Sequence, residues 1–223
     1  MTLDEMYAEM DLYGFDDFED AQKLTLLNES YFDLITREPW PFLETTTDLL
    51  LPSGEAQITN NSAVLNPSTN VSMPLADVNT VLSFIDLTNR VVMVPERTDV
   101  IEKNYMVIPT NIYPDKYYFI AEDMFVYPAA MGDTTYRLYY LRTPVAATAT
   151  TDTGAWILPE RHHSVVLYGA LVKAFLVNDD PQAAMFQNMY ESRYQQMRAD
   201  AWMQQYDRTD RIHVITDAYD WNY

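Results

Sequence analysis

LPERHHSVVLYGALVKAFLVNDDPQAAMFQNMYESRYQQMR, residues 158–198, decides the fold, because it predicts two helices joined by a short acidic turn. Pro159 suits the start of the first helix, which is apolar around most of its circumference. The turn NDDP (residues 178–181) supplies an aspartate N-cap and a proline for the start of the second helix, which runs to about Tyr206. A helix that is apolar on nearly every side is typical of a protein core, and Gly169 would let a neighbouring helix approach closely.

Two further helices are predicted ahead of this hairpin. Residues 1–13 carry an apolar stripe, and Thr2 and Glu5 have the spacing of a capping box. Gly14 follows, where a C-terminal cap belongs. A second helix is expected over residues 17–37 and should end before Pro39, since the residue ahead of a proline avoids the helical region. Together with the hairpin, these helices predict a bundle.

The segment between the helices, residues 45–145, predicts an antiparallel β-rich subdomain. Residues 116–120 and 124–127 have the composition of paired strands, and residues 134–142 alternate in the period of a strand. One face of that last strand is expected to carry three large apolar residues: Tyr136, Leu138 and Tyr140. The threonine run at residues 45–47 is interpreted as part of a turn-rich stretch.

The end of the chain, residues 207–223, lacks a helical pattern and is expected to form an extended tail. Three of its residues favour a β-strand, namely Ile212, Val214 and Ile215, and three aromatic residues lie among aspartates: Tyr219, Trp221 and Tyr223. Such a terminus is either disordered or becomes ordered against a partner. All six residues are therefore candidate partner-binding residues.

Trp40 and Phe42 are the other two candidates for partner binding. They lie in the stiff sequence PWPF, where two prolines surround large apolar side chains. We expect them to fold back onto the helical core, and the alternative places them on another subunit.

The predicted fold class is thus α+β, a helical bundle with an inserted antiparallel β subdomain and an extended C-terminal tail. The expected organisation comprises N-terminal helices at 1–44, the β-rich subdomain at 45–145, the helical hairpin at 146–206 and a partner-docking tail at 207–223.

Charge is the strongest feature of the composition: the formal net charge is −19, and residues 1–20 hold eight acidic residues without a lysine or arginine. A chain with this charge is not expected to bind phosphate backbones, which require clustered basic residues. The absence of cysteine excludes disulfides and thiolate metal sites. We expect no secretory signal and no membrane contact, because the longest apolar run is too short to span a bilayer.

Candidate chemistry is sparse. His162 and His163 are adjacent, so on a helix they point in different directions, and capping or surface roles are expected rather than metal binding. Ser164 lacks the Gly-x-Ser-x-Gly context of a nucleophile. Glu122 and Asp123 could form half of a glycosidase carboxylate pair, although adjacent acids are common in so acidic a chain. The prediction is therefore no catalytic residue, no cofactor and no metal site.

The order of these features resembles the head-to-tail adaptor (head-completion or connector) proteins of tailed bacteriophages. Five stretches carry the resemblance and together cover about residues 24–200: the opening helix running into WPFL at 40–43, YPDKYY at 113–118 with FVYP at 125–128, YRLYYLRTP at 136–144, WILPE at 156–160 with the apolar helix after it, and NDDP at 178–181 with the long helix after it.

The resemblance implies a structural protein of the virion and not an enzyme. It would form a ring, expected to hold 12 copies, under the portal at the neck, and would be assembled in the host cytoplasm. Its partners would be the portal, the next neck or tail protein, and double-stranded DNA that passes through the channel without specific binding. Two alternatives remain open: a tail-terminator or tail-tube component, and a phage-encoded glycan hydrolase that uses acidic residues of the β subdomain.

Overall fold

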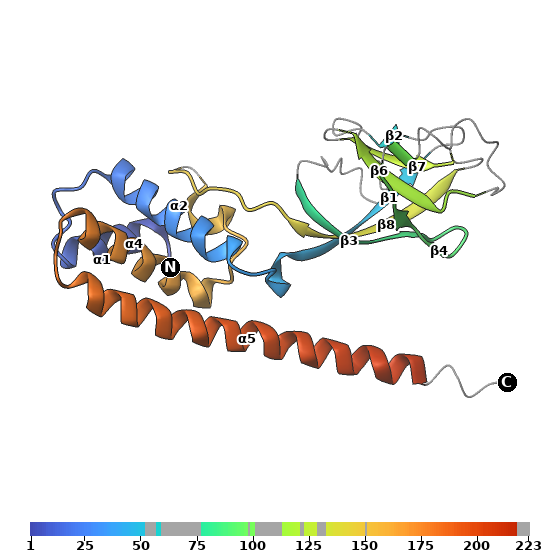
Figure 1. The fold of residues 1–223 in the computed structure, drawn as a ribbon. Helices are drawn as coiled ribbons and strands as arrows, with labels where there is room; N and C mark the ends of the chain where they lie inside the picture. The colour runs from blue at the N-terminus through green and yellow to red at the C-terminus, as the bar shows by residue number, and fades with distance from the viewer. Residues whose placement is uncertain are drawn as a thin grey trace. The chain divides into compact units, whose positions relative to one another are not determined.

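The structure is a computed structural model that describes residues 1–51, 57–58, 77–97, 99–100, 113–120, 123–128, 133–149 and 151–217. The chain divides into two compact units (Figure 1). The helical unit contains Met1–Phe42 and Pro144–Tyr223, and the β unit contains Leu43–Thr143. Helices and mainly antiparallel strands lie in separate stretches of the chain, so the predicted α+β class is confirmed.

The first helix of the helical unit, α1 (Leu3–Leu12), begins as its sequence predicts. The backbone N–H of Glu5 donates to Thr2 Oγ1 at 3.2 Å, and the N–H of Thr2 donates to Glu5 Oε2 at 3.0 Å, which completes the capping box. Gly14 follows with φ at +91°, a backbone conformation that glycine adopts without strain. The buried side of the helix consists of Leu3, Met6 and Met10.

The second helix, α2 (Asp20–Thr36), begins three residues after the predicted start and is capped by Glu19. It packs against α4 (His163–Val177), which follows the short 3-10 helices η3 (Asp152–Ala155) and η4 (Glu160–His162). Ser30 of α2 is buried and donates its hydroxyl to the carbonyl oxygen of Val166 at 2.8 Å. The ring of Tyr190 on α5 (Ala183–Asp217) would lie 3.1 Å from a Cβ atom added to Gly169, as expected for the partner helix of the hairpin. The closest neighbour is Ser30 Oγ of α2, with which the added atom would collide, so α2 makes the tighter approach.

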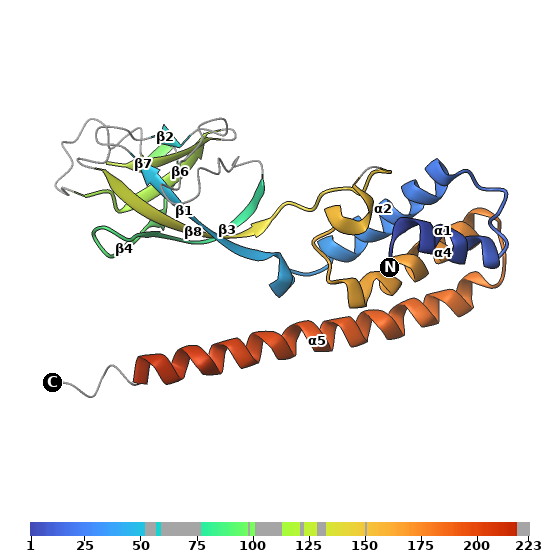
Figure 2. The same cartoon turned by 180° about the vertical axis from the view of Figure 1, so that it is seen from behind.

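The final helix, α5, extends from Ala183 to Asp217 and contacts α4 along its first part (Figures 1 and 2). The turn before it is capped as expected, because Asp180 Oδ1 accepts the N–H of Gln182 at 2.8 Å. In both views the C-terminal part of α5 continues past the other helices of this unit.

The length of α5 corrects the prediction of an extended tail. Residues 207–217 are helical, so the expected β-strand at Ile212, Val214 and Ile215 is wrong. No proline or glycine follows Pro181 in the sequence, so nothing in the chain interrupts the helix once it has started. Tyr219, Trp221 and Tyr223 lie outside the described residues.

The β unit contains two four-stranded sheets whose inner faces share one core (Figure 2). The strand order is β1 (Glu44–Leu51), β8 (Thr134–Arg142), β3 (Val78–Asp86), β4 (Val91–Val92) in one sheet and β2 (Gln57–Ile58), β7 (Asp123–Tyr127), β6 (Lys116–Ile120), β5 (Val94–Pro95) in the other. All described pairings are antiparallel except that between β5 and β6. The predicted pairing of residues 116–120 with 124–127 is confirmed.

Strand β8 is central to its sheet, between β1 and β3. Its alternation is confirmed, since Tyr136, Leu138 and Tyr140 are buried in the shared core while Arg137 on the other face is half-exposed. On that outer face, Arg137 Nε and Nη2 lie 2.7 and 2.8 Å from the two carboxylate oxygens of Asp48 on β1. This hydrogen bond lowers the pKa of Asp48.

Strand β1 corrects the interpretation of the threonine run. Residues 45–47 are paired with residues 138–140 of β8 and are therefore part of the sheet. Threonine is branched at Cβ and fits a pleated surface, so a polar run of this kind is compatible with a strand whose outer face meets water.

Candidate partner-binding site

The predicted partner-binding residues do not come together in one site. Ile212, Val214 and Ile215 belong to α5, whereas the three terminal aromatic residues lie outside the described part of the chain. Trp40 and Phe42 lie at the other end of the sequence, in and beside the 3-10 helix η1 (Pro41–Leu43). Three of the candidates thus lie on α5, and the attachment of this helix to the helical unit defines the candidate site.

Trp40 folds back onto the helical core, as the sequence predicts. Its side chain is 0% exposed, and its indole N–H donates to the carbonyl oxygen of Leu34 at 3.0 Å. Its ring stacks on Phe42 at 5.6 Å and meets the Tyr194 ring edge-to-face at 5.9 Å. Trp40 thus has no free surface for another subunit, while Phe42 is half-buried and stays a candidate.

The end of α2 holds α5 through a polar and aromatic cluster. The Arg37 guanidinium lies over the rings of Tyr190 and Tyr194, at 5.2 and 5.1 Å from their centroids. The Tyr194 hydroxyl donates to Glu38 Oε1 at 2.9 Å, and Arg198 pairs with the same carboxylate at 2.9 Å. Burial, followed by the Glu38 hydrogen bond, raises the pKa of Tyr194, so its phenol stays protonated and remains a donor.

The side of α5 that faces the core can be followed from Ala183 to Ala201 among the described side chains. The buried positions recur at spacings of three and four: Ala183, Phe186, Tyr190, Tyr194, Met197 and Ala201. The next two residues are exposed, Trp202 at 37% and Met203 at 71%. Ala201 is thus the last buried position of α5 among the described side chains, and the helix itself continues to Asp217.

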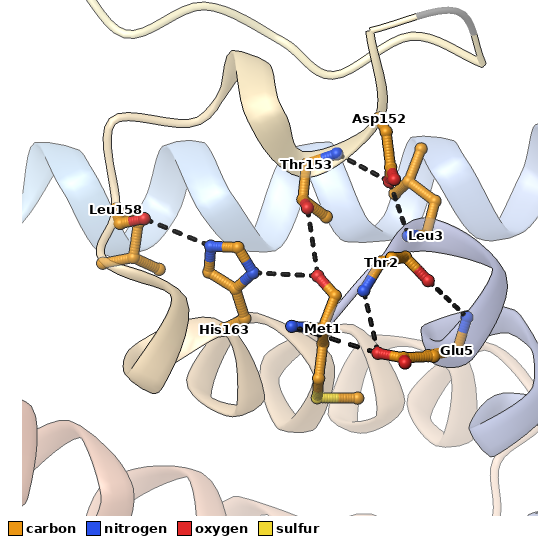
Figure 3. Close-up of polar contacts among 8 residues, drawn as sticks. All are labelled: Met1, Thr2, Leu3, Glu5, Asp152, Thr153, Leu158 and His163. Carbon is orange, nitrogen blue, oxygen red and sulfur yellow. Dashed lines mark hydrogen bonds and ion pairs between the residues drawn. The ribbon is translucent and has the colours of Figure 1, made fainter.

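The N-terminus is attached to α4 by a set of hydrogen bonds that the sequence did not reveal (Figure 3). The carbonyl oxygen of Met1 accepts the hydroxyl of Thr153 at 3.0 Å and lies 3.0 Å from His163 Nδ1. His163 Nε2 lies 3.1 Å from the carbonyl oxygen of Leu158. A buried imidazole thus connects the start of the chain with the segment that precedes η4.

Asp152 extends this N-terminal latch, which we define as Met1, Leu3, Asp152, Thr153, Leu158 and His163. Its Oδ1 atom accepts the backbone N–H of Leu3 at 2.6 Å and that of Thr153 at 2.7 Å (Figure 3). The carboxylate lies at the start of α1, where a negative charge is favoured by unpaired N–H groups. Nothing at residues 152–163 signals contact with residue 1, because the partners are far apart in sequence.

Both histidines are buried, which corrects the expected surface role. His162 occupies the N-cap position of α4 without a side-chain cap bond, and His163 belongs to the latch. Burial and the nearby Arg161 cation lower the pKa of His162, against an opposing effect of Asp200. Each ring lies in the helical unit as a structural group.

Chemistry of other kinds finds little support among the described residues. No group of three or more histidine, aspartate or glutamate side chains in that part of the chain could hold a metal ion. No helix in the same part is both long and apolar enough to cross a bilayer. Glu122 lies outside the described residues, and Asp123 is the first residue of β7. The structure therefore gives no distance between these two carboxylates that would support the glycosidase alternative.

Two comparisons with known proteins bear on the function of the chain. No curated protein matches the chain. A family model described as SU10 adaptor protein matches residues 1–214, which include α1 and nearly all of α5 in addition to the stretches that carried the resemblance. The predicted membership among phage head-to-tail adaptors is therefore confirmed, and the chain belongs to the SU10 adaptor protein family.

Proposed function

We propose that this phage adaptor forms a ring beneath the portal, extends the DNA channel and joins the capsid to the neck or tail. The ring is expected to contain 12 copies, to be assembled in the host cytoplasm and to reside at the neck of the virion. The observation that carries the proposal is the family match over residues 1–214.

The long helix α5 is consistent with this role. It continues past the other helices of its unit to Asp217, and the exposed side chains of Trp202 and Met203 are suited to contacts beyond their own chain (Figure 1). Portal and tail proteins are the partners that the adaptor family implies. Residues 207–223, with Ile212, Val214, Ile215 and the terminal aromatic residues, are proposed to dock on the portal.

Negative charge is proposed to serve the channel. A wall lined by carboxylates repels the phosphate backbone, so DNA slides without specific binding. The net charge of −19 supports this part of the proposal. Lysine and arginine lining the lumen of an assembled ring would contradict it.

The test is electron microscopy of particles of the encoding phage, labelled with gold-bound antibody against this chain. Gold between head and tail is the expected result. Gold along the tail would replace the proposal with a tail-tube or terminator role. Absence of label on both intact and disrupted particles, with antibody binding to the pure protein confirmed, would overturn a virion role and direct attention to glycan hydrolysis.

A further inference from the structure

Helix α5 carries a second stripe on the side that faces away from its own core. Each member is displaced by two positions from a residue of the buried stripe, and two positions turn about 200° around a helix. The members are Met185, Asn188, Ser192, Gln196, Ala199 and Met203, which we call the outward face of α5. The buried stripe and the outward face therefore both recur at spacings of three and four residues, on opposite sides of α5.

The outward face is uncharged, where a solvated helix would usually carry charged side chains. Met185 is 53% exposed and Met203 is 71% exposed, while Ser192, Gln196 and Ala199 are exposed small or neutral residues. Methionine side chains adapt to the shape of a partner, and small residues between them allow a close approach. None of the six residues carries a charge.

Arg193 lies beside this face and lacks a carboxylate partner among the described side chains. Its exposed guanidinium donates only to Gln196 Oε1, at 3.3 Å. In contrast, Arg37, Lys173 and Arg198 each pair with a carboxylate of the same unit. Arg193 shares this state with Arg161, whose Nε lies 3.0 Å from His162 Nε2, but Arg193 is the one that lies beside the outward face of α5.

A groove with the complementary character lies elsewhere on the helical unit. It has a volume of about 350 Å³, and its apolar walls include Leu3, Tyr7 and Leu24. Asp4, Asp20 and Asp152 line it as well, and no lysine or arginine does. Burial, followed by these three carboxylates, raises the pKa of Tyr7, as expected for a site of negative potential.

We propose that the outward face of α5 docks on a second copy of this chain, with Arg193 entering the groove between α1 and α2 of that copy. Charge complementarity selects this occupant, because the groove supplies three carboxylates and the outward face supplies the arginine. The inference rests on the proposed ring and identifies the contact that closes it. Because two different surfaces meet, the contact is heterologous and repeats from copy to copy, as a ring requires.

Cross-linking tests this contact directly, because the chain has no cysteine and introduced thiols are therefore the only ones. Gln196→Cys is placed on the outward face and Ala21→Cys at the groove, where it leaves the three carboxylates in place. The variant with both substitutions, treated with a short bis-maleimide, should give a ladder of multimers, whereas each single variant should remain uncross-linked. Absence of a ladder from the double variant would overturn the contact, and dimers from Gln196→Cys alone would show two outward faces meeting.

A charge reversal tests the role of Arg193 in the same double-cysteine background. Arg193→Glu should lower the ladder yield about tenfold or more, because like charges then meet in the groove. Arg161→Glu is the matched control, since this exposed arginine lies outside α5 and makes the same change in net charge. An unchanged yield for Arg193→Glu, or an equal loss for both variants, would contradict the pairing.

The two proposals fail in different ways. Gold at the neck together with an absent ladder would overturn only the α5 contact and retain the adaptor role. Gold along the tail together with a ladder would retain the contact between copies in a ring or tube of another kind.

Discussion

The two units bury their cores in different ways. In the β unit, the inner faces of two sheets close on each other, and the three large side chains of β8 are enclosed between them. In the helical unit, α2, α4 and the first part of α5 enclose a core, but α5 continues past the other helices to Asp217, and Ala201 is its last buried side chain among those described (Figure 1). Strand β8 has a neighbouring strand on each edge and a buried inner face within its own unit, whereas α5 has exposed side chains on the side away from its core.

This difference indicates where partners are expected. A strand between two others uses its backbone hydrogen bonds within the sheet, whereas a helix satisfies its own backbone and can leave one side free. The helical unit therefore has apolar surface to offer on α5 without exposing unpaired backbone. Mutations that act on the cores and on the free part of α5 should separate these roles.

The largest effect is expected from Leu138→Ala in the β unit. Leu138 is 0% exposed in the shared core, and its truncation leaves a cavity that should cost about 2–5 kcal/mol of unfolding free energy. Chemical denaturation followed by near-ultraviolet and far-ultraviolet circular dichroism measures the loss. If the helical signal is lost at the same reduced denaturant concentration as the tertiary signal, the two cores unfold together and the comparison weakens.

Gly169→Ala should produce the next largest effect, in the helical unit. The new Cβ would occupy the position of Ser30 Oγ, which is held by its bond to the Val166 carbonyl, so the expected loss is about 1–3 kcal/mol. Thermal unfolding measures it. Gly154→Ala is the matched control, because an added Cβ there meets nothing within 4 Å. The double variant Gly169→Ala with Ser30→Ala should recover part of the loss, and no recovery would refute the Ser30 contact.

A smaller effect is expected at the outer face of the β unit. Asp48→Asn removes the charge that pairs with Arg137, and because both side chains are about one-third exposed the loss should be about 0.5–1 kcal/mol at neutral pH. The pKa of Asp48 is lowered in the folded state, so its contribution is present above about pH 4 and disappears as the pH falls below that. Urea denaturation should show a smaller difference at pH 3 than at pH 7, because the contribution is lost as the pH falls towards the lowered pKa of Asp48. A difference of equal size at both pH values would exclude the ion pair as its cause.

Local signals explain which elements could be predicted. The capping box of Thr2 and Glu5, the close approach at Gly169 and the alternation of β8 each depend on residues a few positions apart, and each is confirmed. The threonine run in β1 was misread because its partner strand lies about ninety residues later in the chain. The N-terminal latch was missed for the same reason, since Met1 meets Thr153 and His163 only in the folded unit.

The end of α5 was misread for a different reason. Ile212, Val214 and Ile215 favour a strand by composition, but a helix without proline or glycine ahead of them continues through such residues. The partner-binding role of these residues remains a prediction, and Trp40 is excluded from it by burial.

The most direct test of the account is a variant that lacks residues 207–223, assayed for its ability to join phage heads to tails. Ala201 is the last buried side chain of α5 among those described, and we expect the variant to unfold at the temperature of the full chain and yet fail to join heads. A fall in melting temperature comparable to that of Leu138→Ala would contradict the claim that this part of α5 lies beyond the core. Normal joining by the shortened chain would contradict its role in partner binding.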